Sequence, residues 1–293
     1  GAAVKVGRRR AASGASVEPL RSHLAVVGTP AAPGRPRAKP PTSVPTTMDP
    51  DGPGVSFEIT AAPERITTLV CGFSRFGLAG LTAVDYLADH LEMAPIGHVR
   101  TAELPAITPF ENGVPRHHTR LFARDDLDVA VLVNELFVPL FAADPLARSI
   151  LDWMDANAIG EVAVLAGVPV AHGPEEHRVF HVATEDYRAR RLEGVDIPGM
   201  GSGFLDGVNA SLLSRGMDTD LRAGVFLTPV HAQAPDVEAA LRLIDGFEAV
   251  YGLDVDSGPL EAFAEEVQQY YRELAGRLQN VEQAHIPEDR MYM

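Results

Sequence analysis

The chain has 293 residues, of which 46% are hydrophobic, and a formal net charge of −15. A chain of this size can bury a sizeable core, as one large domain or two small ones. Residues 1–47 carry eight basic residues and one acid, whereas residues 48–293 carry 17 basic and 39 acidic residues, a net charge of −22. Because the acidic part has no basic stripe to neutralise phosphates, the sequence excludes a nucleic-acid binder.

Lysine is absent from Met48 to the end, and the same part is rich in Ala, Val, Gly and Asp. This style of composition is typical of proteins from salt-loving archaea. There, carboxylates keep the surface hydrated, and molar salt screens their mutual repulsion. We therefore predict a halophilic, archaeal protein that loses stability as the salt concentration is lowered.

The cysteine count and the hydropathy pattern indicate the compartment. Cys71 is the single cysteine, so no intramolecular disulfide can form, and a reducing cytoplasm is the natural location. No apolar run approaches 18 residues, so we expect no membrane span. The N-terminal arginine cluster is not followed by the apolar region of an export signal. We predict a cytoplasmic protein.

The N-terminal segment differs in composition from the rest. Residues 1–47 are rich in Ala, Pro, Gly, Ser and Arg without periodicity, and such a segment cannot bury enough surface to fold. We assign residues 1–54 to a disordered basic extension and expect Met48 to be the biological start. A genuine basic tail is the alternative.

Between residues 55 and 256, short apolar runs alternate with segments of helical periodicity. The predicted strands are Ile66–Cys71, His118–Phe122, Val129–Val133, Val162–Ala166, Arg178–Ala183 and Ala223–Leu227. The predicted helices are residues 78–91, Ala142–Asn157, Gly203–Arg215 and Val237–Tyr251. This alternation predicts one α/β domain with a largely covered sheet.

A last helix is predicted over residues 257–283, opened by Pro259 at its first turn. Its apolar residues recur at spacings of four and three: Leu260, Ala264, Val267, Tyr271, Leu274, Leu278 and Val281. Such a heptad seam can pack on its own domain or on another subunit. Pro287 cannot continue a helix, so residues 284–293 are predicted to be a flexible tail.

A glycine-rich loop between the first strand and the first helix is a possible ligand site, formed by Gly72, Ser74, Gly77 and Gly80. Phosphate cradles and catalytic elbows occupy such positions. The Walker A, dinucleotide and nucleophile-elbow patterns each fail here on spacing or residue type. A tight turn with close helix–sheet packing is therefore the preferred interpretation, and we predict no cofactor.

The histidines do not form a zinc pattern. His172, His177 and His181 are spaced by five and four along a loop, and a second cysteine is lacking. We predict no metal site and interpret them as solvated loop residues. Cys71, at the end of an apolar strand, is predicted to be a buried, inert thiol.

The chain ends in Met291-Tyr292-Met293, an apolar residue and a tyrosine followed by the terminal carboxylate. A partner can capture such a carboxylate in a pocket. The tyrosine ring supplies apolar area, and its hydroxyl can find a polar partner. A frayed terminus without function is the alternative.

The order of motifs resembles the proteasome assembly chaperone 2 family in its archaeal form, over about residues 57–275. The motifs that carry the resemblance are residues 70–80 with Tyr86-Leu87, Glu103-Leu104-Pro105, residues 161–167, residues 203–210, and Asp236 through Asp256. Ser74-Arg75 departs from the family, which often has a proline there.

The resemblance implies a three-layer α/β/α sandwich of phosphorylase-like architecture, here with a long C-terminal helix and a flexible tail. It implies a cytoplasmic, commonly oligomeric protein that is associated with the proteasome core particle and is not known for catalysis. Some members end in a hydrophobic-Tyr-any tripeptide, which proteasomal activators insert between α-ring subunits. Met291, Tyr292 and Met293 match it residue by residue.

The resulting hypothesis is a non-catalytic, ATP-independent proteasome assembly chaperone or adaptor that docks its tail on the α subunits and forms a homo-oligomer. Two alternatives stay open. One is a nucleoside- or phosphate-type enzyme that uses the Gly72–Gly80 loop. The other is a structural oligomer without a proteasome link.

Overall fold

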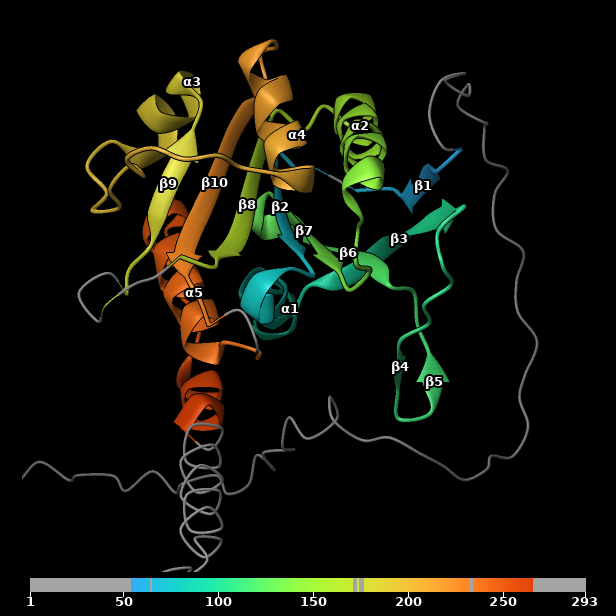
Figure 1. The fold of residues 1–293 in the computed structure, drawn as a ribbon, viewed down its shortest axis with the longest axis horizontal. Coiled ribbons are helices and arrows are strands. Elements are labelled where there is room, and N and C mark those ends of the chain that lie inside the picture. The colour runs from blue at the N-terminus through green and yellow to red at the C-terminus, as the bar shows by residue number, and fades with distance from the viewer. Residues whose placement is uncertain (1–53, 64, 171–172, 174–176, 232–233, 266–293) are drawn as a thin grey trace, which may run out of the picture. The chain divides into compact units, whose positions relative to one another are not determined.

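The computed structural model describes residues 54–63, 65–170, 173, 177–231 and 234–265 (Figure 1). The predicted extension, most of the predicted C-terminal helix, the tail and His172 lie outside these residues.

An eight-stranded sheet forms the centre of the described part, with the strand order β1-β3-β6-β7-β2-β8-β10-β9. Strands β7, β2, β8 and β10 are parallel, and antiparallel strands extend the sheet on both sides. The bounds are β1 Ser56–Ala61, β2 Thr68–Phe73, β3 Ala94–Ala102, β6 Thr119–Arg124, β7 Val129–Asn134, β8 Glu161–Val168, β9 Phe180–Ala183 and β10 Arg222–Pro229. A separate hairpin consists of β4 Phe110–Glu111 and β5 Val114–Pro115.

Helices cover both faces of this sheet, as Figure 1 shows. The α-helices are α1 Ala79–His90, α2 Leu140–Ala156, α3 Glu185–Tyr187, α4 Gly207–Met217 and α5 Val237–Tyr251. Short turns are η2 Phe76–Leu78, η3 Asp125–Leu127 and the π-helical η5 Arg188–Leu192. Helix α1 packs against α5, and α2 packs against α4. The predicted α/β class with a covered sheet is confirmed.

The two cores follow the alternation of side chains along the strands. In β2, Val70 belongs to the core under α1 and α5, whereas Leu69 and Cys71 belong to the core under α2 and α4. All six residues of β2 and of β7 are buried, as expected for strands that are covered on both faces. Cys71 is fully buried, as predicted, and burial raises the pKa of its thiol.

Both edges of the sheet are covered by the chain itself. On β1, the backbone oxygens of Phe57 and Ala61 accept hydrogen bonds from Ser149 Oγ and Trp153 Nε1 of α2, at 3.1 and 3.0 Å. On β9, His181 pairs with residues 198–200 through two backbone hydrogen bonds. Covered edges resist the addition of a further strand.

The C-terminal helix is described only over residues 258–265. Within this part, Leu260 and Ala264 are 2% and 6% exposed and belong to the core under α1 and α5. Tyr86 of α1 donates a hydrogen bond of 2.6 Å to the backbone oxygen of Asp256, just before the helix. The first two residues of the predicted seam therefore pack on their own domain.

Candidate functional site

The glycine-rich loop follows β2 at the carboxyl edge of the parallel strands, and two of its glycines allow close packing. A Cβ atom on Gly72 would lie 2.3 Å from the backbone oxygen of Gly80. A Cβ atom on Gly80 would lie 2.0 Å from the backbone oxygen of Leu165 in β8. Both contacts are far below van der Waals distance, so these glycines let α1 approach the sheet.

Gly77 has a positive φ of 62°, which glycine adopts without steric cost. Its backbone oxygen accepts a hydrogen bond of 2.8 Å from the backbone N–H of Asp236, the N-cap of α5. The Asp236 carboxylate accepts hydrogen bonds from Ala239 N and from His231 N and Nδ1. Burial opposes its ionisation, but these hydrogen bonds outweigh burial and lower the pKa of Asp236. The loop is thereby fixed to the start of α5.

The loop also lies at the topological switch point of the sheet, where the connections that follow two neighbouring parallel strands run to opposite faces. After β2 the chain enters α1 on one face, and after β7 it enters α2 on the other; ligand crevices open at such points. Here Ser74 N donates a hydrogen bond of 3.0 Å to the backbone oxygen of Asn134, across the two strand ends. Within the described residues, no hydrogen bond joins the Ser74 hydroxyl to a histidine or a carboxylate.

Segments that are joined at this edge carry five exposed apolar side chains. These are Phe76, Phe137, Leu140, Phe141 and Phe204, which are 40–103% exposed, and we call them together the carboxyl-edge surface. Exposed apolar clusters on a folded domain mark contacts with partners.

Hydrogen bonds hold the three segments of the carboxyl-edge surface together. The Ser74–Asn134 bond joins the loop after β2 to the connection that leads into α2. Arg75 forms an ion pair of 2.9 Å with Asp206, the N-cap of α4, which joins that loop to the segment of Phe204. The sequence did not indicate this surface.

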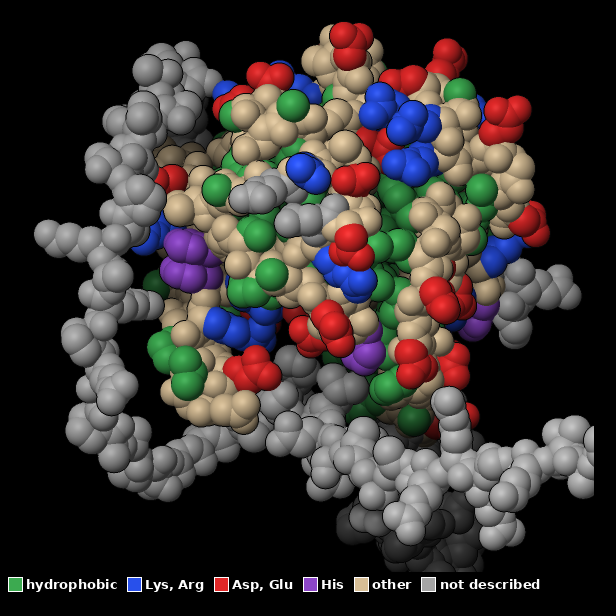
Figure 2. Space-filling model, turned by 180° about the vertical axis from the view of Figure 1, so that it is seen from behind, with side chains coloured by type: hydrophobic (Ala, Val, Ile, Leu, Met, Phe, Trp, Pro, Cys, Tyr) green, Lys and Arg blue, Asp and Glu red, His purple; other side chains and the backbone are tan. Residues whose placement is uncertain are grey.

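The β4–β5 hairpin adds apolar side chains beside this edge. Ile107, Phe110 and Val114 are 44%, 63% and 65% exposed. The base of the hairpin is held by Arg116, whose guanidinium lies 2.8 Å from a carboxylate oxygen of Glu135 after β7. Figure 2, which shows the molecule from behind, has hydrophobic side chains at the lower left, on the side where the hairpin projects.

A polar network of buried and partly buried side chains supports these loops. Thr119 donates a hydrogen bond of 2.6 Å to Asn134 Oδ1, and Asn134 Nδ2 donates one of 2.8 Å to the backbone oxygen of Leu136. Arg120 pairs with Asp85 at 3.0 Å and with Glu135 at 3.6 Å. The network links β6, β7 and α1 beneath the exposed apolar residues.

Two histidines near this network form a face-to-face stack. The rings of His98 and His117 lie 3.6 Å apart between centroids with 5° between their planes, and His98 Nε2 is buried without a hydrogen bond inside the described part. Burial lowers the pKa of His98, and the positive charges of His117, Arg100 and His118 lower it further against the opposing effect of Glu58. The folded state therefore favours the neutral ring.

This stack predicts a loss of stability in mild acid. Folding lowers the pKa of His98, so the unfolded chain binds the proton first as the pH falls below about 6.5. The contribution of His98 to the free energy of unfolding is therefore full above that pH and declines below it. His98→Phe keeps a ring for the stack and removes this proton. Melting temperatures measured between about pH 7 and 5 should fall less steeply for the variant. Equal slopes would show that His98 does not contribute.

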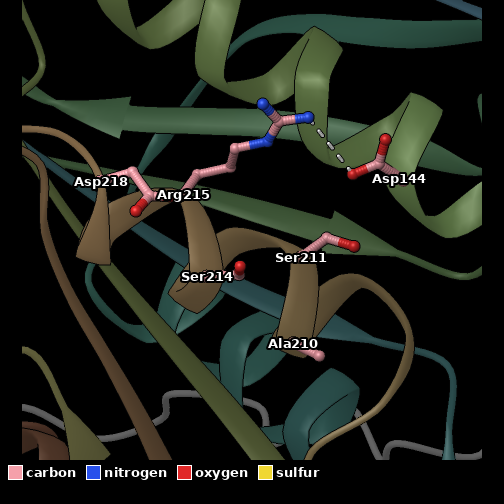
Figure 3. A pocket seen from close by; sticks show the side chains of 6 residues that line it. All are labelled: Asp144, Ala210, Ser211, Ser214, Arg215 and Asp218. Carbon is pink, nitrogen blue, oxygen red and sulfur yellow. Dashed lines mark ion pairs between the residues drawn. The ribbon is translucent and has the colours of Figure 1, made fainter.

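A shallow polar pocket of about 350 Å³ lies between α2 and α4 (Figure 3). It is lined by Asp144, Ala210, Ser211, Ser214, Arg215 and Asp218. Arg215 pairs with Asp144 at 3.6 Å, which bridges the two helices. None of the glycine-loop residues lines it. Of the described residues, no three His, Cys, Asp or Glu side chains are grouped as a metal site would require.

The predicted tail residues Met291, Tyr292 and Met293 lie outside the described residues, so the structure does not place them relative to this edge. Within the described ranges, no helix has both the length and the apolar character needed to cross a membrane.

The fold is that of known α/β proteins. PbaA of Pyrococcus furiosus, an archaeal homolog of proteasome-assembly chaperone, matches with a TM-score of 0.70 at 21% identity, over 78% of this chain and 95% of that chain. PbaB of the same organism, an archaeal proteasome activator, matches with a TM-score of 0.63 at 19% identity, over 75% and 98%. A PAC2 family protein from Streptomyces avermitilis matches with a TM-score of 0.55 at 18% identity, over 71% and 95%.

The described part is thus a mixed α/β domain with a large central sheet and flanking helices, the fold of these solved structures. No curated protein sequence matches this chain significantly. The model of the PAC2 family matches residues 69–275, well over half of the chain. The chain belongs to the PAC2 family, and this part of the predicted resemblance is confirmed.

Proposed function

We propose that this protein is a non-catalytic, ATP-independent proteasome assembly chaperone or adaptor. The observation that carries the proposal is its membership of the PAC2 family over residues 69–275. The fold likeness to PbaA and PbaB is consistent with it. The exposed carboxyl-edge surface suits a protein that acts through contacts with other proteins.

In this proposal the protein is cytoplasmic, halophilic and archaeal, and the phosphorylase-like domain of residues 55–256 is its folded body. The helix of residues 257–283 and the tail of residues 284–293 present Met291, Tyr292 and Met293 to the α ring of the core particle. The terminal carboxylate would pair with a basic group in a pocket between α subunits, and the Tyr292 ring would pack on the pocket wall.

Tail variants test this docking. Deletion of residues 291–293, or Tyr292→Ala, should abolish co-purification with the core particle from a high-salt lysate. A single tail binds weakly, because ordering a flexible segment opposes binding. Several tails on one oligomer would act at high effective concentration, so loss of the tripeptide should remove nearly all of the avidity.

Asp289→Asn is the matched control, since it changes the same tail but leaves the tripeptide intact. It should co-purify as the wild type does. Circular dichroism and light scattering should show that every variant folds and assembles normally. If the deletion variant still binds the core particle like the wild type, the contact runs through the folded domain and the tail proposal is wrong.

We further propose that the protein is a homo-oligomer and that the carboxyl-edge surface is the contact between copies. Within the described residues, both edge strands of the eight-stranded sheet are bonded to other segments of the chain, which disfavours pairing of copies through these strands. A second copy would bury this surface, and closed symmetric assemblies are the usual solution.

Replacement of Phe137 and Phe141 by serine should shift the particle mass in molar salt toward the protomer mass of 31.4 kDa, measured by light scattering. The control is Met217→Ser, because Met217 is 70% exposed but lies at the end of α4, away from this edge. A double variant with the wild-type mass would exclude this surface as the interface. A monomeric wild type would exclude the homo-oligomer itself.

A further inference from the structure

A buried glutamate at the opposite edge of the sheet organises three arginines. Glu161 is the first residue of β8 and is 1% exposed. Its Oε1 accepts hydrogen bonds of 2.7 Å from Arg191 Nε and 3.2 Å from the Tyr251 hydroxyl. Its Oε2 lies 3.1 Å from Arg222 Nε and 3.5 Å from Arg190 Nε. One carboxylate thus meets three guanidinium groups.

All three arginines approach Glu161 through Nε. Within the described residues, their terminal nitrogens Nη1 and Nη2 form no hydrogen bond with another protein group. The side chains of Arg190, Arg191 and Arg222 are 59%, 23% and 31% exposed, so each of them is partly open to solvent. A guanidinium has five N–H donors, and most of them are therefore available to a ligand.

The surrounding aromatic residues hold the arginines in place. The Arg191 guanidinium lies 4.5 Å from the centroid of the Tyr251 ring, a cation–π contact. The hydroxyl groups of Tyr251 and Tyr187 are hydrogen-bonded at 2.8 Å, and Tyr187 is fully buried. Because Arg191 is fixed before any ligand arrives, binding there costs less ordering entropy.

The charge balance leaves this site positive. Three arginines and one glutamate carry a net charge of +2, in a part of the chain whose net charge is −22. In the view from behind, Figure 2 shows basic side chains gathered at the upper right, among many acidic ones. This is the side of the molecule on which α3 and β9 lie. A cluster of partly exposed guanidinium groups with two excess charges attracts a doubly charged anion.

We propose that Arg190, Arg191 and Arg222 form a binding site for a phosphate-type dianion, either inorganic phosphate or the phosphate group of a small ester. Guanidinium groups bind phosphate oxygens through paired N–H donors, and the pairs are short and strong. Glu161 is the positioning residue, because it contacts the three Nε atoms and leaves the terminal nitrogens without a hydrogen bond to the described part of the chain. This site is independent of the proposed proteasome contact, since it lies at the amino edge of the parallel strands.

Titration calorimetry of the full chain tests the site, with inorganic phosphate and glycerol 3-phosphate as separate probes at constant ionic strength in chloride. Arg190→Gln removes the most exposed arginine with the longest contact, so folding should be preserved. It should weaken phosphate binding by about tenfold, as expected for the loss of a charge-assisted hydrogen bond.

Arg215→Gln is the control, because Arg215 is 47% exposed and lies in the pocket between α2 and α4. It should bind phosphate as the wild type does. Binding of phosphate alone supports a site for the free ion, and binding of both probes supports a site for phosphoesters as well. No heat from either probe with the wild type overturns the proposal, as does equal affinity in Arg190→Gln.

Discussion

Gly80→Ala should destabilise the fold by about 3 kcal/mol, at the upper end of the range for overpacking a core. The added Cβ would lie 2.0 Å from the backbone oxygen and 2.7 Å from the backbone carbon of Leu165. Leu165 lies in β8, which pairs with β2 on one side and β10 on the other, so its backbone cannot move away. Urea unfolding at fixed high salt measures the change as a lower midpoint.

The matched control is Gly201→Ala, at a glycine with a negative φ whose added Cβ meets nothing within 4 Å. It should change the free energy of unfolding by less than about 0.5 kcal/mol, as surface substitutions do. If Gly80→Ala unfolds at the wild-type midpoint, α1 does not approach the sheet as closely as described. The interpretation of this glycine as a packing residue would then be wrong.

The strong periodic segments were predicted well from sequence, because burial on one face imposes a clear pattern. The predicted helix Val237–Tyr251 has the bounds of α5. Its ends carry local signals, with Asp236 as the N-cap and Gly252 in the left-handed conformation after the last turn. The four parallel strands were predicted from short β-branched apolar runs, with ends that differ by one or two residues.

Elements without that pattern were missed. Strand β3 contains Pro95 and Gly97, and the register of its pairing with β6 shifts between them. Both residues weaken a strand signal. The β4–β5 hairpin is too short for periodicity, and its only signal is the turn Asn112-Gly113, where both residues have positive φ.

The close helix–sheet packing predicted for the glycine loop is found at Gly72 and Gly80, whereas the start of α4 was placed too early. The prediction began that helix at Gly203, but α4 begins at Gly207 after the N-cap Asp206. Residues 199–203 are irregular instead, with Gly199 in an isolated β-bridge to His181.

The carboxyl-edge surface could not be predicted, because the hydrophobic pattern of a sequence does not show which apolar residues stay exposed in the folded domain. Leu136 is 2% exposed, whereas its neighbour Phe137 is 67% exposed. The arginine site could not be predicted either, because its residues are far apart in the sequence. Arg190 and Arg191 lie about thirty positions from both Glu161 and Arg222. The register of β8 with β10 places Arg222 beside Glu161, and the pairing of β9 with β10 brings the segment that leads to Arg190 and Arg191 to the same side of the sheet.

Glu161→Gln should lower the free energy of unfolding by roughly 3 kcal/mol, which is typical for breaking a buried ion pair from one side. Glutamine keeps the shape and one acceptor oxygen but removes the charge that three arginines share. Arg191 is the most enclosed of the three and would be left without a counter-ion. Urea unfolding checks the value, with Glu193→Gln as an exposed control that should change stability by less than about 0.5 kcal/mol.

A double-mutant cycle with Arg191→Gln shows whether the loss comes from the uncompensated charge. In the wild type, Arg191→Gln removes a hydrogen bond of 2.7 Å to Glu161 and should destabilise the fold. In the Glu161→Gln background the same change removes an unpaired cation, so it should cost less or restore part of the stability. The coupling free energy should reach about 1–3 kcal/mol, as measured for contacting residues in one network. Additive losses would show that the arginines are held by packing on Tyr251 rather than by the buried carboxylate.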